Sequence, residues 1–142
     1  MSLCLFRSDI WEIQPQGYMM YCQHPMKISK TQLNDNYKLE FENYNSTSVI
    51  KIVTKNNELV ASEGRVVIID DLAIYDRIIT DNNHRRQGLA TFLMKELENI
   101  ALANGICKNF LVATEEGKLL YENMGWELYC LYTSIVIKNK TL

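Results

Sequence analysis

The sequence lacks the features that define several large protein classes. No run of apolar residues approaches the roughly 20 that a membrane-spanning helix requires. The first residues, Met-Ser-Leu-Cys-Leu-Phe-Arg, lack the charged region, apolar stretch and cleavage site of a secretory signal. With a net charge of −2 and 47% hydrophobic residues, the chain is neither disordered nor a polybasic nucleic-acid binder. We therefore expect a cytoplasmic protein that binds neither a membrane nor nucleic acid.

Metal and redox motifs are missing as well. There is no Cys-x-x-Cys pair, and the two histidines, His24 and His84, are far apart in the sequence. This spacing predicts neither a zinc site nor a disulfide framework. We expect no bound metal and reduced thiols at the four cysteines, Cys4, Cys22, Cys107 and Cys130.

The 142 residues predict a single domain, 1–142, that is long enough to bury a core. No internal repeat or low-complexity linker divides it. Residues 1–36 have the least regular pattern, in which only Ile28–Asn34 suggests a short helical segment. From there the β-branched and aromatic residues predict an antiparallel series of strands at 37–44, 49–54, 66–69 and 72–80.

The second half alternates helix and strand. A stripe of Leu89, Phe92, Leu93 and Leu97 predicts a helix over about 87–103, with charged Lys95, Glu96 and Glu98 largely off the stripe. A buried strand is expected at 109–114, then a short helix, and the segment 127–137 reads as strands that close the sheet. The pattern predicts an α/β domain.

The segment Thr80–Leu97 joins the last strand of the series to the long helix and predicts an anion site. The first N–H groups of a helix have no partners within it, and the helix dipole is positive there. Gly88 and Ala90 would let a diphosphate approach those N–H groups, and Arg85 and Arg86 add positive charge.

Arg85-x-x-Gly88-x-Ala90 resembles the Arg/Gln-x-x-Gly-x-Gly/Ala signature with which GNAT acyltransferases bind the pyrophosphate of acetyl-CoA. The segment Glu115–Trp126 is similar to the second signature of the family, Leu-Tyr-Glu-x-x-Gly-Phe/Trp. The resemblance covers roughly Arg65–Ile137. It implies a GNAT-like fold with a mixed, mostly antiparallel central sheet flanked by helices. It also implies cofactor contacts at Ile78, Thr80, Arg85, Arg86, Gln87, Gly88, Leu89, Ala90 and Thr91.

The activity that the resemblance implies is direct transfer of an acetyl group from acetyl-CoA to a primary amine of a small molecule or peptide. The two strands at 72–80 and 109–114 would separate to admit the pantetheine arm, which would hydrogen-bond to their exposed backbone. A homodimer is one expected assembly. The acceptor is not specified by these residues.

Asp76 interrupts an apolar row on the strand 72–80. Strict alternation places it on one face with Ile78 and Thr80, and places Arg77 on the other. A buried carboxylate requires a partner, so Asp76 either pairs with a neighbouring strand or has a catalytic role. Deprotonating a lysine-like amine costs about 4 to 5 kcal/mol at pH 7, and a carboxylate can order a water that removes the proton. GNAT enzymes often carry an acid here.

Tyr121, in the expected short helix, matches the tyrosine that GNAT enzymes place near the cofactor sulfur. With ordinary values a phenol is a weaker acid than a thiol, so a hydrogen bond to the developing thiolate is easier than full proton transfer. The alternative is an aromatic anchor for the helix. Glu115 and Lys118 depart from the family pattern of Asn and Ala, which leaves the cofactor contacts at this helix start open.

Two alternatives belong to other functional classes. The first is a non-catalytic acyl-CoA-binding or protein-interaction domain that keeps the GNAT fold. The second is a nucleotide-binding protein, but the Lys-Ser/Thr and Gly-x-Gly-x-x-Gly loops that this requires are absent from the sequence.

Overall fold

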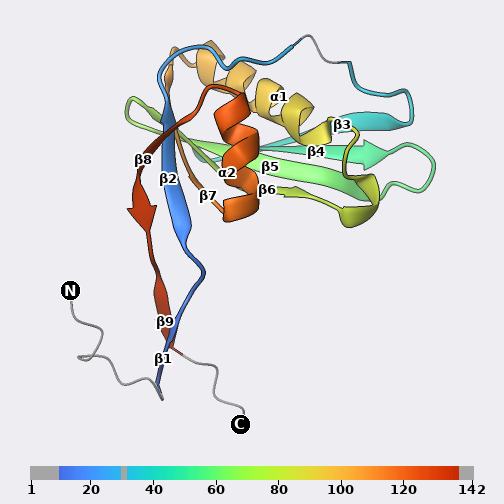
Figure 1. Cartoon of the computed structure of the whole chain (residues 1–142). Coiled ribbons are helices and arrows are strands. Elements are labelled where there is room, and N and C mark those ends of the chain that lie inside the picture. Colours follow the sequence, from blue (N-terminus) through green and yellow to red (C-terminus); the bar gives the residue numbers. More distant parts are fainter. Residues whose placement is uncertain (1–9, 30–31, 138–142) are drawn as a thin grey trace.

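A seven-stranded sheet with the order β3-β4-β5-β6-β7-β2-β8 forms the body of the protein (Figure 1). The computed structural model describes residues 10–29 and 32–137. All neighbouring strands are antiparallel except β6 and β7, which are parallel. The mixed α/β fold expected from the sequence is confirmed. The elements are β1 (Trp11–Ile13), β2 (Gly17–Cys22), β3 (Tyr37–Tyr44), β4 (Thr47–Thr54), β5 (Val60–Ile69), β6 (Leu72–Thr80), a 3-10 turn (Asn82–His84), α1 (Leu89–Ala103), β7 (Lys108–Ala113), α2 (Glu115–Asn123), β8 (Glu127–Tyr132) and β9 (Ile135–Ile137).

The predicted antiparallel series is present as β3 to β6. Its tight turns place Asn45 and Asp70 at positive φ, 52° and 53°, a conformation that these two residue types tolerate better than most. The pairs run from Tyr37 opposite Thr54 to Ile69 opposite Leu72, and the register shifts once between β4 and β5 and once between β5 and β6. The long strand β6 is thereby delivered to the loop that precedes α1.

The C-terminal strands differ from the expectation that they simply close the sheet. β8 is the last strand of the seven, but it pairs with the N-terminal strand β2, which lies between β7 and β8. β9 leaves the sheet and pairs with β1, so that Ile13 lies opposite Ile135 in a two-stranded ribbon. Figure 1 shows this β1/β9 ribbon extending away from the body. Sequence periodicity identifies strands but does not identify their partners.

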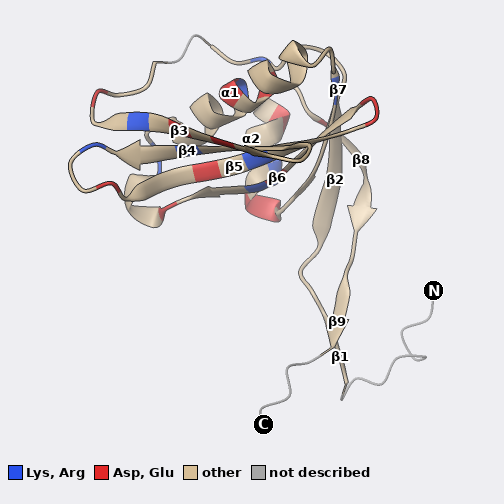
Figure 2. Cartoon of the chain, turned by 180° about the vertical axis from the view of Figure 1, so that it is seen from behind, with Lys and Arg blue, Asp and Glu red and all other residues tan. Residues whose placement is uncertain are grey.

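Both helices lie on the same face of the sheet (Figures 1 and 2). α1 packs on β4, β5 and β6 through buried Leu93, Met94 and Leu97. Gly64 on β5 allows this close approach, since a Cβ atom there would lie 3.1 Å from Leu93 and 2.5 Å from Ile78. Within the described ranges, the opposite face of the sheet is not covered by a helix. No described helix is both long and apolar enough to cross a bilayer.

The helix expected at Ile28–Asn34 is wrong for the residues of that segment that are described, which have irregular backbone. The segment just before it is held from outside: Lys27 N–H donates to Met124 O at 2.7 Å, and Met26 N–H donates to the Glu98 carboxylate at 2.8 Å. Backbone groups that are satisfied by other elements need no helix of their own.

Glu98 is a correction to the expected polar face of α1. Its side chain is only 2% exposed, although the sequence pattern places it away from the apolar stripe. It is buried because both oxygens have partners: Oε2 accepts from Met26 N–H, and Oε1 accepts from Lys95 Nζ at 3.0 Å. A paired carboxylate can lie in a core that would reject a free one.

Replacing Glu98 by Leu should therefore destabilise the protein by about 1 to 3 kcal/mol, because the buried Met26 N–H loses its carboxylate acceptor. Urea unfolding of the two proteins measures the difference. Glu98→Gln keeps an acceptor oxygen and should lose less. Equal losses for the two variants would show that the hydrogen bond to Met26 contributes little.

Candidate functional site

The parallel pairing of β6 and β7 stops halfway along both strands. Partners run from Leu72 opposite Lys108 to Tyr75 opposite Leu111. Beyond this point β6 contains a bulge, where the register with β5 shifts and Arg77 has φ of 54°. The strands then separate, and a cavity of about 730 Å³ lies between them. Its wall combines the second half of β6, the following loop, the start of α1, the end of β7 and the start of α2.

The bulge corrects the predicted alternation of β6. Ile78 contacts the α1 side of the sheet, since it lies against the position of Gly64 beside Leu93 and Leu97. Asp76 precedes the bulge and faces the other side, where Arg65 of β5 is its register partner. One extra residue in a strand exchanges the faces of everything that follows it. Asp76 and Ile78 therefore do not share a face.

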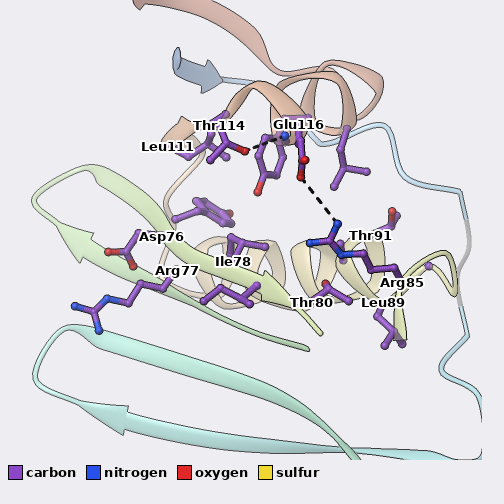
Figure 3. A pocket seen from close by; sticks show the side chains of 18 of the residues that line it. Asp76, Arg77, Ile78, Thr80, Arg85, Leu89, Thr91, Leu111, Thr114 and Glu116 are labelled. Carbon is purple, nitrogen blue, oxygen red and sulfur yellow. Dashed lines mark hydrogen bonds and ion pairs between the residues drawn. The ribbon is translucent and has the colours of Figure 1, made fainter. Parts of the chain in front are cut away.

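Asp76 is held by a two-point ion pair. Arg65 Nε donates to Oδ1 at 2.5 Å and Nη2 donates to Oδ2 at 2.8 Å. Hydrogen bonding to Asp76 raises the pKa of Arg65 above its ordinary value. Of the two alternatives for Asp76, pairing with a neighbouring strand is present. Asp76 is still one of the lining residues, at the end of the cavity marked by Asp76 and Arg77 in Figure 3.

The other end of the cavity is the loop between β6 and α1. Asp81 caps the 3-10 turn by accepting from Asn83 N–H at 3.1 Å, and the chain then passes through Arg86 at φ of 65° and Gly88 at φ of 74°. Gly88 is the N-cap of α1 and has no side chain that could accept a hydrogen bond. The first N–H groups of the helix therefore remain free to donate to a ligand. A Cβ atom at Gly88 would meet nothing within 4 Å. Glycine is required there by the backbone conformation and not by protein crowding.

Arg85 faces Glu116 across the mouth of the cavity, with 3.9 Å between Nη1 and the nearest oxygen (Figure 3). The pair is exposed, with 56% and 87% of the two side chains accessible. Such a pair contributes little to stability. Arg85 is therefore available to an anionic ligand that displaces Glu116.

A hydrogen-bonded triad of Tyr37, His84 and Gln87 connects this loop to β3. The buried Tyr37 of β3 donates its single hydroxyl proton to Gln87 Oε1 at 3.0 Å. Its oxygen lies 2.7 Å from His84 Nδ1, which must then be the donor. Tyr37 was missed by sequence reasoning because it lies 47 residues before His84. No local pattern connects two such positions.

Tyr121 enters the cavity from α2. Thr114 caps that helix by accepting from Gly117 N–H at 3.1 Å, and a Cβ atom at Gly117 would lie 3.0 Å from the Tyr121 ring. The ring is 7% exposed and lies 6.1 Å from Trp126. Burial raises the pKa of Tyr121 to about 12. Its hydroxyl makes no hydrogen bond to another described residue, so it keeps a donor for a ligand.

The structure brings together most residues that the sequence singled out. The exception is Gln87, whose side chain turns to Tyr37 and does not line the cavity. Lys118 also lies outside it, paired with Glu122 at 3.3 Å and stacked over Tyr18. The described residues contain no His, Cys, Asp and Glu group suited to a metal ion. The predicted site residues that do line the cavity are Asp76, Ile78, Thr80, Arg85, Arg86, Gly88, Leu89, Ala90, Thr91 and Tyr121.

The family model of the acetyltransferase (GNAT) domain matches residues 46–128, which include both ends of the cavity. A search of curated proteins gave no match.

Solved structures share the fold at low identity. A tandem GNAT protein from the clavulanic acid biosynthesis pathway aligns with a TM-score of 0.73 at 12% identity, over 95% of this chain and 56% of that one. A GCN5-related N-acetyltransferase from Kribbella flavida aligns with a TM-score of 0.65 at 12% identity, over 93% of this chain and 61% of that one. Glucosamine-6-phosphate N-acetyltransferase from Arabidopsis thaliana aligns with a TM-score of 0.54 at 18% identity, over 68% of this chain and 63% of that one. The aligned part of this chain thus spans 56 to 63% of the length of these proteins.

The triad gives a test that does not depend on a ligand. Tyr37→Phe removes the hydroxyl that joins β3 to the loop, and we expect a loss of about 1 kcal/mol because the partly exposed His84 and Gln87 can turn to water. Amide hydrogen exchange over residues 84–88 should become faster. Exchange rates that equal those of the original protein would show that the loop is held without the triad.

Proposed function

Because the chain belongs to the GNAT acetyltransferase family, we propose that it is an N-acetyltransferase that moves an acetyl group from acetyl-CoA to a primary amine of a small molecule or peptide. The observation that carries the proposal is the cavity between β6 and β7. It joins an uncapped helix N-terminus at one end to a buried tyrosine hydroxyl and a strand bulge at the other. One elongated ligand with a diphosphate and a reactive terminus matches that order of groups.

The residues present fit acetyl-CoA. The free N–H groups at the start of α1, with the space in front of Gly88, suit a diphosphate, and Arg85 and Arg86 supply positive charge. Ile78 and Thr80 follow the last β6–β7 pair at Tyr75, so on that side their backbone groups are free to bind an extended arm. When bound, acetyl-CoA supplies an acetyl thioester, whose carbon an amine attacks as the thiolate leaves.

Tyr121 is the residue we assign to the departing thiolate. Because the pKa of its phenol is about 12, transfer of the phenol proton to a thiolate of ordinary basicity would be unfavourable by about 5 kcal/mol. A hydrogen bond to the developing negative charge requires no transfer, and burial strengthens it. The tyrosine therefore acts as a fixed donor, and the final proton of the thiol comes from solvent or from the acceptor amine.

The acceptor amine would enter from the bulge end, where Asp76 and Arg77 line the cavity. Asp76 is a weak candidate for direct proton removal, since Arg65 occupies both of its oxygens. We assign it to ordering water and attracting a cationic amine, while solvent removes the proton. Positioning of amine and thioester in one cavity supplies much of the rate.

A non-catalytic acyl-CoA-binding domain is the alternative. It would use the same diphosphate end and would have no need for a donor at the reactive end. The unshared hydroxyl of Tyr121 favours the enzyme.

The diphosphate end can be tested with two matched glycines. Gly88 and Gly105 have nearly equal φ, 74° and 75°, and a Cβ atom at either would meet nothing within 4 Å. Tryptophan at either position should cost roughly 1 to 2 kcal/mol of backbone strain. Only Gly88→Trp should bind acetyl-CoA and CoA more weakly, with a Kd raised at least about tenfold. Calorimetric titration measures the Kd, and ATP is the control ligand.

If Gly88→Trp binds acetyl-CoA as tightly as Gly105→Trp does, the loop before α1 is not part of the binding site. If acetyl-CoA and CoA fail to bind the unmodified protein, the proposed function is wrong.

Tyr121→Phe tests the other end. With an acceptor identified from an amine library, kcat should fall roughly 100-fold or more, because one donor to a developing anion is lost. KM for acetyl-CoA should change little, since the diphosphate end is intact. Tyr129→Phe, on an exposed side chain outside the cavity, is the matched control.

The pH profile gives an independent check. A phenol with a pKa of about 12 stays protonated through pH 10, so the rate should rise as the amine deprotonates and show no falling limb by pH 10. An ordinary phenol would be half ionised near pH 10. A fall in rate there that is absent from Tyr121→Phe would contradict the assignment.

A further inference from the structure

β8 is an edge strand with all six of its residues exposed. Four of them are large and apolar, with 44% of Leu128, 67% of Tyr129, 61% of Leu131 and 43% of Tyr132 accessible. In the described part of the chain nothing pairs with its outer side. An edge of this kind presents a row of free N–H and C=O groups beside apolar side chains.

The edge lacks the usual protection against a second strand. β8 contains neither lysine nor proline, and its one charge is Glu127 at the first position. A bulge at Tyr129, between the partners of Met19 and Met20, disturbs the first half of the strand. The second half, from Cys130 to Tyr132, pairs without a shift opposite Met19, Tyr18 and Gly17. Figure 2 shows charged residues over β3 to β6 and very few along this edge.

The β1/β9 ribbon adds a second reason for a partner. Its two strands of three residues each pack mainly on one another within the described residues. Large apolar side chains are exposed on it, with 52% of Ile13, 41% of Val136 and 57% of Ile137 accessible. A two-stranded ribbon alone is at best marginally stable in water. β9 continues β8 after two residues, so one partner can cover both.

We propose that β8 pairs antiparallel with β8 of a second copy of this chain, across a two-fold axis near Leu131, to form a continuous sheet. The strand is compatible with itself. An axis near Leu131 places Glu127 beyond the pairing of Cys130–Tyr132, so like charges do not meet. Leucine then faces leucine, and Cys130 faces Tyr132 on the opposite side of the sheet. Such an interface is closed, because each copy uses the same patch.

The antiparallel direction also places the ribbon. Since β9 extends beyond the end of β8, it lies beside the beginning of β8 in the second copy rather than in water. The same contact therefore covers the two exposed apolar surfaces at once. None of Leu128, Tyr129, Leu131 and Tyr132 lines the cavity, so assembly and cofactor binding can be measured separately.

The experiment is sedimentation velocity of the full chain over a range of concentrations, for the unmodified protein, Leu131→Lys and Leu119→Lys. Leu119 lies on α2, outside the cavity, and is equally exposed at 66%, so it is a matched control. The original protein and Leu119→Lys should sediment at twice the mass of one chain. Leu131→Lys should sediment as a monomer, because two lysines would meet near the axis.

Thermal unfolding and CoA titration of Leu131→Lys establish that the variant is folded. Amide hydrogen exchange locates the contact: exchange over Glu127–Tyr132 should be slower in the dimer than in Leu131→Lys. A monomeric original protein would overturn the proposal. So would a dimer that survives Leu131→Lys, or one whose β8 amides exchange as fast as in the monomer. A monomer that gains protection at β8 only when another protein binds would show a different occupant.

Discussion

The site depends on the point at which β6 and β7 stop pairing. Two parallel strands that remained paired would satisfy their own backbone and leave no room between them. Here the last pair is Tyr75 with Leu111, and the bulge at Arg77 then turns β6 away. Backbone donors and acceptors become free in the same place as a cavity opens. Because α1 begins where β6 ends and α2 begins where β7 ends, the separation also sets the distance between the two helix starts.

The cavity has different chemistry at its two ends, and each end is made by a different kind of interaction. At the α1 end the positive field comes from backbone N–H groups and from Arg85, whose exposed partner Glu116 is easily displaced. At the α2 end is the single neutral hydroxyl of Tyr121, whose buried ring lies beside Trp126, and low polarity there strengthens a hydrogen bond to an anion. The helices hold these groups, and the sheet holds the helices. Glu98 connects α1 to Met26, and the Tyr37 triad connects the loop before α1 to β3.

The two faces and two edges of the sheet have different roles. One face is covered by both helices and contains the core, while the other carries the Arg65–Asp76 pair and no described helix (Figure 2). The β3 edge contains charged residues such as Glu40 and Glu42, whereas the β8 edge is nearly uncharged. The insertion of β2 between β7 and β8 moves the apolar edge far from the cavity. The cavity and the apolar edge therefore lie on different parts of the sheet.

The sequence by itself determined most of the elements from Tyr37 onward and the turn before α1. The β-branched strands from Tyr37 onward, the apolar stripe of α1 and the Gly88 turn are local patterns, and all are present. Tertiary structure decided the rest. The bulge at Arg77, the pairing of Asp76 with Arg65, the burial of Glu98 and the link from Tyr37 to His84 each depend on a residue from another element. Periodicity reports which side of its own element a residue occupies. It carries no information about the neighbour that packing brings to that side, and such neighbours decide whether a charge is buried and where a side chain points.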